Sequence, residues 1–342
     1  MKLAVTGAGG FIGSHLVRAL AAQGHAAATT CLVRNPQAAA RLDALGLRVV
    51  RGDLRDPRAL TDLCRDADVV FHLAARVQFG LGGAGAGEFT ADNVEGTRAL
   101  LEACPPTVRR FLHMSTMNAV ERAPGDPCTQ PLTEESPCHP QTPYGRSKWQ
   151  AEQAVRTLAA AKGIPYLIVR APSLVYGPGC HPASGMATLI RSVAAGSLLT
   201  ALDFPGRFSL IHVQDLVEAT VRLGLATECP NETFFLCQEP PMTIGEIAEA
   251  IAAQLGVRRR RVALPRAVYR TASWMTATAM RVPGLARAIP LQLPMVLRDY
   301  AAVSARKART AAGFATRIAL ADGLRETAPW VLAAEGGPSA RR

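Results

Sequence analysis

The sequence predicts an α/β fold, a doubly wound parallel sheet followed by a smaller, mostly helical C-terminal lobe. Apolar strand-like runs alternate with helix-like segments of roughly 10 to 15 residues through the first half of the chain, as in parallel sheets. A glycine-rich turn joins the first strand to the first helix. After Arg170 the alternation breaks down among prolines and glycines. A chain of 342 residues also exceeds the roughly 250 to 300 that one core usually serves.

The alternation sets the order of the elements. We expect strands at 2–6, 27–33, 49–52, 69–73, 110–114 and 166–170, and helices at 11–23, 36–45, 56–65, 90–103 and 143–161. Right-handed crossovers place consecutive strands side by side. A strand and helix at 209–219 should return to this sheet, followed by a strand at 233–237. The predicted division is a sheet domain of residues 1–175 rejoined by 207–238, a lobe of 176–206 and 239–330, and a flexible tail of 331–342.

Charge is distributed unevenly along the chain. The formal net charge is +11, but Arg258 to Arg342 holds sixteen Lys or Arg against four acids, a balance of +12, which leaves −1 for the rest. Aromatic residues make up 5%, too few to favour stacking on single-stranded nucleic acid. Arg258 to Arg261 lie between a helix and a strand and are typical of a solvated turn. No nucleic-acid partner is therefore expected.

Eight cysteines without a CxxC pair indicate neither a metal site nor a disulfide framework. The first five residues run directly into the glycine-rich turn, so no apolar leader segment is recognised. No stretch reaches the roughly 18 to 20 apolar residues that span a bilayer. These observations predict a cytoplasmic protein.

The glycine-rich turn after the first strand predicts a dinucleotide site. Gly7 permits the tight turn, Gly10 lets the backbone approach a pyrophosphate, and Gly13 allows close helix packing. Phe11 and Ile12 open the helix, whose N-terminus then faces the phosphates. A plain strand-to-helix turn is the alternative interpretation.

The end of the second strand bears on which dinucleotide binds. An NAD site usually offers an acid to the ribose 2′-hydroxyl, whereas an Arg accommodates a 2′-phosphate. Here Arg34 stands at that position, Arg41 is a second candidate, and the nearest downstream acid is Asp43. The sequence therefore favours NADP(H). NAD(H) stays open as the alternative, because Arg34 is also compatible with a solvated loop.

Tyr144 and Lys148 are candidates for proton transfer. Thr142 and Pro143 predict the start of a helix, so the tyrosine and lysine would share one face of its first turns. A cation beside a phenol lowers the pKa of the phenol and makes it a usable acid or base.

Two hydroxyl side chains, Ser115 and Thr116, end another predicted strand. Strand ends are where ligands bind in open α/β sheets. Thr116 is suited to donate a hydrogen bond to a substrate oxygen.

Together these segments carry a family resemblance. The chain resembles the extended short-chain dehydrogenase/reductase family, also called the NAD-dependent epimerase/dehydratase family, over roughly residues 1 to 330. The motifs that support the resemblance are TGxxGxxG at 6–13, Gly-Asp-Leu at 52–54, His-Leu-Ala-Ala at 72–75, Asn-Val-Glu-Gly-Thr at 93–97, Ser115-Thr116, Tyr144 with Lys148, Tyr-Gly-Pro at 176–178 and His-Val-Gln-Asp at 212–215.

The resemblance implies a Rossmann fold and specific roles. Tyr144 becomes the general acid or base, Lys148 tunes its pKa and binds the nicotinamide ribose, and Thr116 orients the substrate with Ser115 as neighbour. Asn93 supports the active-site helix. It also implies a homodimer through the helices that contain Asn93 and Tyr144. Tyr144 is also a cofactor contact by this resemblance. Further cofactor contacts carried over are Asp53 and Leu54 at the adenine, and Ala74, Ala75 and Pro172 at the nicotinamide.

Three departures narrow the branch of the family. Met117 and Asn118 replace the Asp-Glu pair that follows the threonine in 4,6-dehydratases. Leu174 replaces an Asn common in sugar-nucleotide members. Residues 172–175 and the end of the second strand look more like the 3β-hydroxysteroid dehydrogenase and dihydroflavonol reductase branches, whose substrates are apolar.

Two apolar ten-residue stretches, bounded by arginines, follow near the C-terminus, at 271–280 and 288–297. Such a region fits peripheral contact with an anionic membrane surface and access for a lipid-like substrate. The alternative is a set of lobe helices covering the active site.

The favoured function is an NAD(P)-dependent oxidoreductase of the type acting on CH–OH groups. It would move a hydride between nicotinamide and a secondary alcohol or ketone of a small hydrophobic substrate, either sterol-like or a β-keto acyl or polyketide-like ketone. The alternatives are a sugar-nucleotide epimerase and a non-catalytic dinucleotide-binding scaffold. The intact Tyr144, Lys148 and Thr116 argue against the scaffold.

Overall fold

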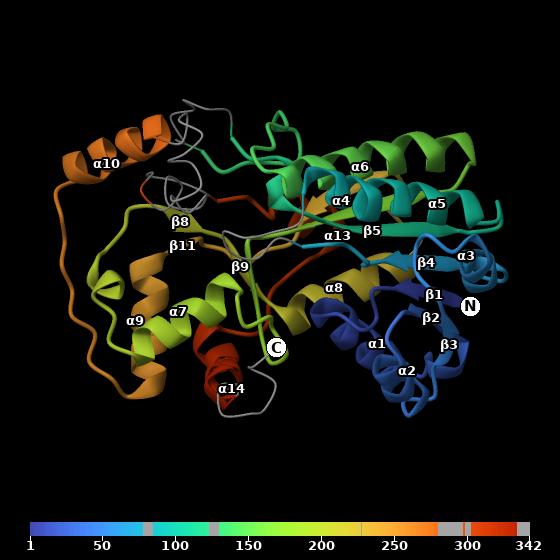
Figure 1. Cartoon of the computed structure of the whole chain (residues 1–342), viewed down its shortest axis with the longest axis horizontal. Coiled ribbons are helices and arrows are strands. Elements are labelled where there is room, and N and C mark those ends of the chain that lie inside the picture. Colours follow the sequence, from blue (N-terminus) through green and yellow to red (C-terminus); the bar gives the residue numbers. More distant parts are fainter. Residues whose placement is uncertain (78–84, 123–129, 227, 280–296, 298–301, 334–342) are drawn as a thin grey trace.

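A computed structural model shows a central sheet flanked by helices, with a smaller lobe at one end (Figure 1). It describes residues 1–77, 85–122, 130–226, 228–279, 297 and 302–333. The predicted tail at 331–342 and the apolar stretch at 288–297 lie almost wholly outside the described residues.

Seven parallel strands form the main sheet in the order β10-β6-β5-β4-β1-β2-β3. The strands are β1 (Leu3–Thr6), β2 (Thr29–Val33), β3 (Arg48–Arg51), β4 (Val69–His72), β5 (Arg110–Thr116), β6 (Tyr166–Ala171) and β10 (Glu232–Phe235). Thr6 at the end of β1 is in register with Leu32 of β2 and His72 of β4. Strand order therefore reverses between β1 and β4, which is the switch point where ligands bind in such sheets.

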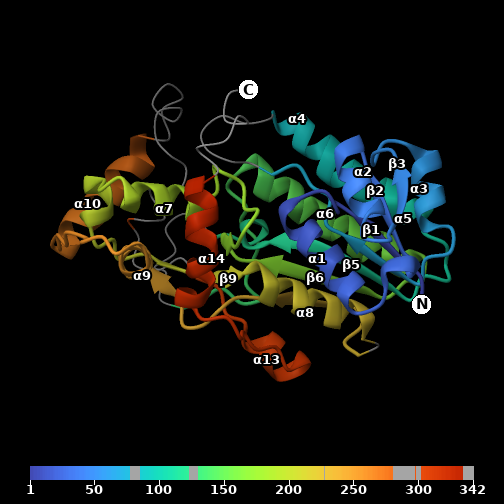
Figure 2. The same cartoon turned by 90° about the horizontal axis from the view of Figure 1, so that it is seen from below.

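Helices cover both faces of this sheet (Figures 1 and 2). They are α1 (Phe11–Ala22), α2 (Pro36–Asp43), α3 (Pro57–Cys64), α4 (Ala86–Phe89), α5 (Gly96–Ala103), α6 (Pro143–Ala161) and α8 (Val213–Leu225), with a π-helical turn at Thr90–Glu95. Leu16 of α1 and Leu216 of α8 belong to one buried cluster. Leu100 of α5 and Val155 of α6 belong to another. The predicted doubly wound α/β fold is thereby confirmed.

Three of these helices begin with the same local device. A side chain caps the first turn and a proline follows it: Asn35 accepts from the Gln37 amide, Asp56 from Arg58, and Thr142 from Gly145. The cap satisfies a backbone donor that the helix leaves free, and proline presets the helical backbone. The predicted start of α6 at Pro143 is confirmed.

One expected strand lies elsewhere. The strand predicted within 209–219 forms β9 (Leu210–His212), which pairs with β7 (Leu174–Tyr176) in a separate two-stranded sheet. Its place beside β6 is taken by β10, where Phe234 is in register with Val169. Only the helix α8 of that segment returns to cover the main sheet. The expectation for the strand was wrong. Both β9 and β10 are apolar, and hydrophobic periodicity does not show which of them pairs with β6.

The lobe has a core of its own. Ile190, Ile247 and Leu324 belong to one buried cluster with Tyr176 of β7. The lobe elements are α7 (Gly185–Ala194), β8 (Arg207–Phe208), β11 (Met242–Thr243), α9 (Ile244–Leu255), α10 (Arg266–Ala279) and α14 (Leu320–Ala333), while α13 (Arg306–Ala312) lies against β10. Among the described helices none is long and apolar enough to cross a membrane.

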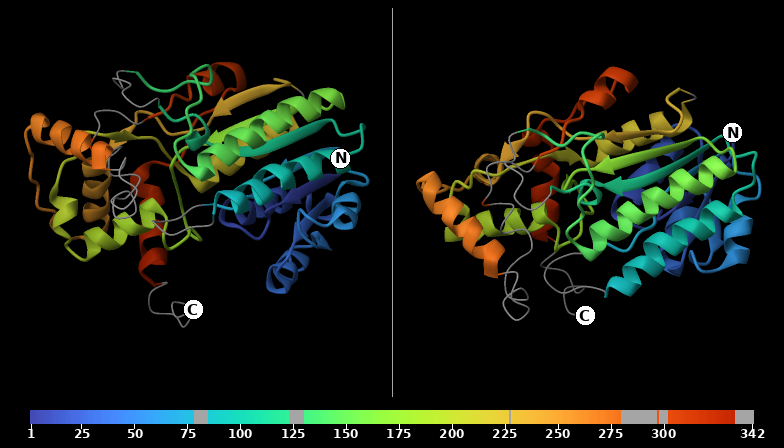
Figure 3. Two further views of the ribbon diagram at one scale, coloured as in Figure 1. Left: turned by 45° about the horizontal axis from the view of Figure 1, so that its top comes forward. Right: turned by 90° about the horizontal axis from the view of Figure 1, so that it is seen from above.

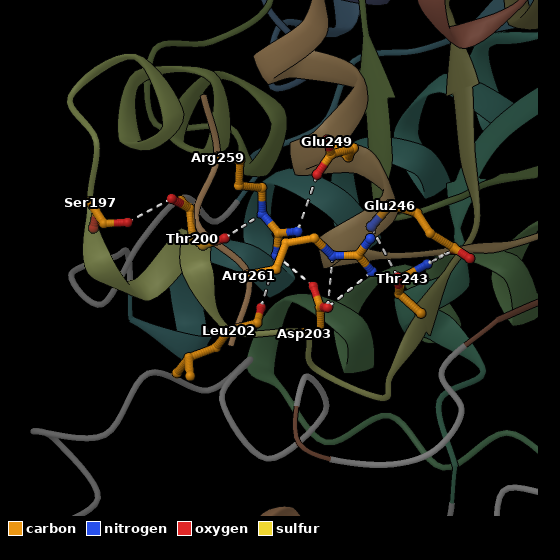
Figure 4. A network of polar contacts seen from close by, with 9 residues as sticks. All are labelled: Ser197, Thr200, Leu202, Asp203, Thr243, Glu246, Glu249, Arg259 and Arg261. Atoms are coloured by element: carbon orange, nitrogen blue, oxygen red, sulfur yellow. Dashed lines mark hydrogen bonds and ion pairs between the residues drawn. The ribbon is translucent and has the colours of Figure 1, made fainter. Parts of the chain in front are cut away.

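The four consecutive arginines do not form a uniformly solvated turn (Figure 4). The side chain of Arg259 is 1% exposed and donates to the Thr200 carbonyl at 2.6 Å and to the Asp203 carboxylate at 2.6 Å. Arg261 also pairs with Asp203. A Cβ at Gly245 would lie 2.5 Å from that carboxylate, so the glycine makes room for the pair. The prediction fails for Arg259 because Asp203, far away in sequence, supplies its partner.

Candidate active site

The turn between β1 and α1 is shaped for a ligand at its backbone. Gly7 has φ +77°, and a Cβ there would lie 2.6 Å from the Ala74 nitrogen. A Cβ at Gly13 would lie 2.0 Å from the Gly7 carbonyl oxygen. The helix begins after Gly10 with no side-chain cap and no acid in its first turn. Its amide groups and the positive end of its dipole therefore suit a pyrophosphate.

The candidate cofactor residues follow the carboxyl ends of parallel strands. Because these ends share one edge of the sheet, the residues lie along that edge on both sides of the switch point. They are Gly7 to Gly13 after β1, Arg34 after β2, Asp53 and Leu54 after β3, Ala74 and Ala75 after β4, and Pro172 after β6. Arg41 lies on α2 and is exposed. The residues present fit a bound dinucleotide.

The end of β2 offers a cation rather than a carboxylate. Arg34 is exposed there, and the adjacent Asn35 caps α2. Asp43 is at the far end of that helix. The carboxylate of Asp53 accepts from the Arg55 amide at 2.8 Å and thereby fixes the turn after β3.

Tyr144 lies in the first turn of α6 and faces the end of β5. Its ring lies 6.0 Å from the buried ring of Phe89, measured between centroids. Burial raises the pKa of the Tyr144 phenol to about 12, against the opposing effect of a hydrogen bond with Thr116. Thr116 also accepts from the Asn118 amide at 3.3 Å. The tyrosine and threonine are thus brought together as predicted, with the phenol in its protonated form.

Lys148 is buried one turn further along α6. Its ammonium donates to the Met114 carbonyl at 2.8 Å and lies 3.1 Å from Nε2 of His113. Burial lowers the pKa of Lys148 to about 8, and the Glu152 carboxylate acts in the opposite direction. The expected lowering of the tyrosine pKa by this lysine is not found, because the ammonium is directed at β5 and burial of the phenol dominates.

A hydrogen-bonded chain links the glycine turn to α5. The Ala74 amide donates to Thr6 Oγ1 at 3.2 Å, and that hydroxyl lies 2.7 Å from Nδ1 of His72. Nε2 of His72 lies 2.8 Å from Thr97 Oγ1, which donates to the Asn93 carbonyl at 2.6 Å. A neutral His72 protonated at Nε2 satisfies every link. Burial lowers its pKa to about 3, so it keeps this form at neutral pH.

Asn93 joins the segment after β4 to the active-site helix. Its amide accepts from the Arg76 nitrogen at 2.7 Å and donates to the Arg76 carbonyl and to Ser147 Oγ. Ser147 in turn donates to the Tyr144 carbonyl at 2.8 Å. The support that the resemblance implied for Asn93 therefore takes a specific form, with Ser147 as a link that the sequence reasoning missed.

Ser115 is not brought to the tyrosine. Its hydroxyl donates to Glu152 Oε1 at 2.6 Å, and Arg170 binds the same carboxylate through Nε at 3.0 Å and Nη2 at 2.7 Å. Successive residues of a strand point to opposite faces, so Ser115 and Thr116 cannot both face Tyr144. The catalytic role predicted for Ser115 is corrected to a place in a buried ion-pair network. The i, i+4 spacing of Tyr144, Lys148 and Glu152 was the signal that could have found it.

The position after Thr116 is apolar. Met117 is buried, and its sulfur accepts from the Ser173 hydroxyl at 3.1 Å. Leu174, the residue after Ser173, is also buried. No carboxylate therefore occupies the place where a 4,6-dehydratase would need one.

Taken together, a glycine cradle at the switch point and a tyrosine, lysine and threonine on the same edge define a dinucleotide-dependent enzyme of the oxidoreductase and epimerase class. The chain belongs to the NAD dependent epimerase/dehydratase family, whose model matches residues 3–234. This bears out the resemblance found in the sequence.

Named relatives span several chemistries. The chain is 33% identical over 266 residues to sterol demethylase protein B of Methylococcus capsulatus, covering 78% of each protein. It is 31% identical to ceramide reductase of Caulobacter vibrioides, covering 97% of this chain and 95% of that one. DesIV, a dTDP-glucose 4,6-dehydratase of Streptomyces venezuelae solved with NAD, superposes with a TM-score of 0.74 at 26% identity over 98% of both chains.

Proposed function

We propose that this protein is an NADP(H)-preferring oxidoreductase that transfers a hydride between nicotinamide and a secondary alcohol or ketone of a hydrophobic substrate. The observation that carries the proposal is the placement of the Tyr144 phenol, which is hydrogen-bonded to Thr116 at the same edge of the sheet as the glycine turn. Such a group is suited to protonate a ketone oxygen during reduction.

Each residue has a separate task in this proposal. A bound nicotinamide supplies or accepts the hydride at C4. Tyr144 donates its phenol proton to the ketone oxygen in reduction and takes the hydroxyl proton in oxidation, and Thr116 donates a hydrogen bond to the substrate oxygen. Lys148 places a positive charge under the site and binds the nicotinamide ribose. The remaining contacts are the Gly7 to Gly13 turn, including Phe11 and Ile12, at the pyrophosphate, Asp53 and Leu54 at the adenine, and Ala74, Ala75 and Pro172 at the nicotinamide.

The apolar surroundings of Thr116 support the proposed substrate class. Met117 and Leu174 replace the polar residues expected of sugar-nucleotide enzymes, and both are buried beside the end of β5 and β6. Two similar proteins carry the names sterol demethylase protein B and ceramide reductase, which are lipid-related. A sterol-like or β-keto acyl-like ketone fits both observations.

Sugar-nucleotide epimerisation is the second candidate. It is favoured by the similarity to UDP-glucose 4-epimerase of Streptomyces lividans, 31% identical over 240 residues, 64% of this chain. An epimerase would retain its cofactor and oxidise and reduce the same carbon. Mass spectrometry of what co-purifies separates the two: a nucleotide sugar with tightly held NAD supports the epimerase, and a sterol or acyl lipid supports the reductase.

Replacing the tyrosine tests the catalytic assignment. Tyr144→Phe should lower kcat by about 10² to 10⁴ while changing dinucleotide affinity much less, since the phenol supplies the proton and the glycine turn supplies most of the binding site. Thr116→Val should also lower kcat. Ser115→Ala is the matched control, because its hydroxyl faces Glu152, so it should lower stability but not kcat. Full turnover in Tyr144→Phe would refute the assignment.

The cofactor preference has its own test. Arg34→Ala should weaken NADPH binding by roughly tenfold or more, since it removes a charge-assisted contact, and should leave NADH binding unchanged. Arg41→Ala tests whether the second candidate arginine also contributes to NADPH binding. Arg65→Ala, at an exposed position after α3, serves as a control. Fluorescence titration of both reduced dinucleotides checks this. Tighter binding of NADH by the unmodified protein would reject the preference.

A further inference from the structure

The helix α10 presents an apolar outer face to solvent. Its inner face is set by Tyr269, which is 4% exposed and packs against Phe204 with ring centroids 5.7 Å apart. On the outer side Trp274 is 69% exposed, Met275 is 58% exposed and Val268 is 46% exposed. An indole with two large aliphatic side chains in water is an unfavourable arrangement unless something covers it.

These side chains are part of a local concentration. Ten large hydrophobic residues are exposed in the described part of the chain, and six of them fall between Val257 and Met275. The other members of the six are Val257, Val262 and Leu264. Scattered single hydrophobic residues need no explanation, but this clustering in one segment does.

The same segment is strongly basic. Residues 256–279 contain six arginines and no acid. Arg258, Arg260, Arg266 and Arg270 are exposed, while Arg259 is used internally by Asp203 (Figure 4). We name the exposed set the basic apolar face, made of Val257, Arg258, Arg260, Val262, Leu264, Arg266, Val268, Arg270, Trp274 and Met275.

The basic apolar face lies at the end of the molecule farthest from β2 and β3. Figures 1 and 3 show α10 and the segment leading to it along the outer edge of the lobe. The segment is anchored from behind: the Val262 amide donates to the Ala201 carbonyl at 2.8 Å, and Arg259 binds Asp203. The face is therefore held in place by the lobe and presented outward.

We infer that the basic apolar face docks on the surface of an anionic lipid bilayer, with α10 lying in the plane of the interface. A helix with tryptophan and aliphatic residues on its outer side and arginines beside them matches interfacial helices. The uncompensated arginines attract anionic headgroups. A nucleic acid would satisfy the arginines and leave Val268 and Met275 in water, so a bilayer fits better. The inference stands on this face alone and is independent of the proposed reaction.

Vesicle binding by the full-length protein tests the inference. We expect co-sedimentation with vesicles that contain phosphatidylglycerol and little with phosphatidylcholine alone, and weaker binding at high salt. Arg266→Gln and Arg270→Gln should each lower the partition coefficient about fivefold. Trp274→Ser with Met275→Ser should remove most of the binding. The matched controls are Leu45→Ser and Val77→Ser, two exposed residues outside the face, which should change nothing.

Tryptophan fluorescence locates the contact. The chain has three tryptophans, of which Trp274 is exposed and Trp149 and Trp330 are partly buried. Anionic vesicles should shift the emission to shorter wavelength, and Trp274→Phe should abolish the shift while keeping most of the binding. Equal binding to both kinds of vesicle, binding unaffected by the face variants, or no binding with self-association through the face instead would each overturn the inference.

Discussion

The carboxyl edge of the main sheet and the basic apolar face treat charged side chains in opposite ways. At the sheet edge Lys148, Glu152 and Arg170 are buried, and each has partners within the protein. On the basic apolar face Arg260 and Arg270 are exposed beside apolar neighbours. Buried charges need partners because water no longer solvates them. The difference indicates that the sheet edge uses charge to fix geometry, whereas the face leaves charge available to an outside partner.

Arg259 is informative because it is buried although its neighbours in sequence belong to the basic apolar face. It stands within the same run as Arg258 and Arg260, yet its side chain is buried and paired like those at the sheet edge. Adjacent arginines therefore have different roles, because the backbone directs their side chains toward the lobe interior or toward solvent.

The largest effect should come from the buried pair beneath the active site. Glu152→Gln puts an amide donor against the Arg170 guanidinium and leaves the cation uncompensated. The free energy of unfolding should fall by about 3–5 kcal/mol. Denaturant unfolding measures it. Asp322→Asn, which breaks an exposed pair with Arg325, should cost at most about 1 kcal/mol. Equal losses in the two variants would remove the distinction between buried and exposed charges.

A smaller effect is expected in the lobe, and it splits the arginine run. Arg259→Met removes hydrogen bonds to Thr200 and Asp203 and should cost about 1–3 kcal/mol in unfolding free energy. Arg260→Met should change stability by less than about 0.5 kcal/mol. It should instead weaken binding to anionic vesicles. Similar stability losses at both positions would contradict the assignment of Arg259 alone to the internal network.

The effect that is smallest at neutral pH is a pH dependence at the sheet edge. The folded pKa of His72 is about 3 and its usual value is 6.5, so below pH 6.5 the unfolded chain takes up a proton that the folded protein does not. The contribution of His72 to the free energy of unfolding is therefore fully present above pH 6.5. As the pH falls below 6.5, this contribution decreases by about 1.4 kcal/mol per pH unit. Burial also lowers the pKa of His113, which adds to the slope.

Unfolding free energies measured between pH 7.5 and pH 5 check the slope. His72→Gln can accept from Thr6 and donate to Thr97 without titrating, so the slope should be shallower in this variant. His139→Gln, at an exposed position, is the control and should leave the slope unchanged. An unaltered slope in His72→Gln would show that another group is responsible.

Most of the sheet could be predicted because its signals are local. The glycine turn, the capped starts of α2, α3 and α6, and the alternation of strands and helices all depend on neighbouring residues. The pairing of β10 and not β9 with β6 could not be predicted, because both are short apolar strands and only packing of the whole chain selects the edge. Ser115 was misassigned for a related reason: spacing indicates the strand end, while the face depends on register.

By itself the sequence determined the fold class, the family and which residues lie at the carboxyl edge of the sheet. The last point follows because the carboxyl ends of parallel strands meet at one edge, and the motifs come directly after those strands. The tertiary structure decided the direction in which the pKa of Tyr144 shifts, the pairing of Glu152 with Arg170, and which arginine of the run is buried. Each of these depends on desolvation by residues distant in the chain. The basic charge noted in the sequence thus became a particular surface only once α10 had buried Tyr269 and turned Trp274 outward.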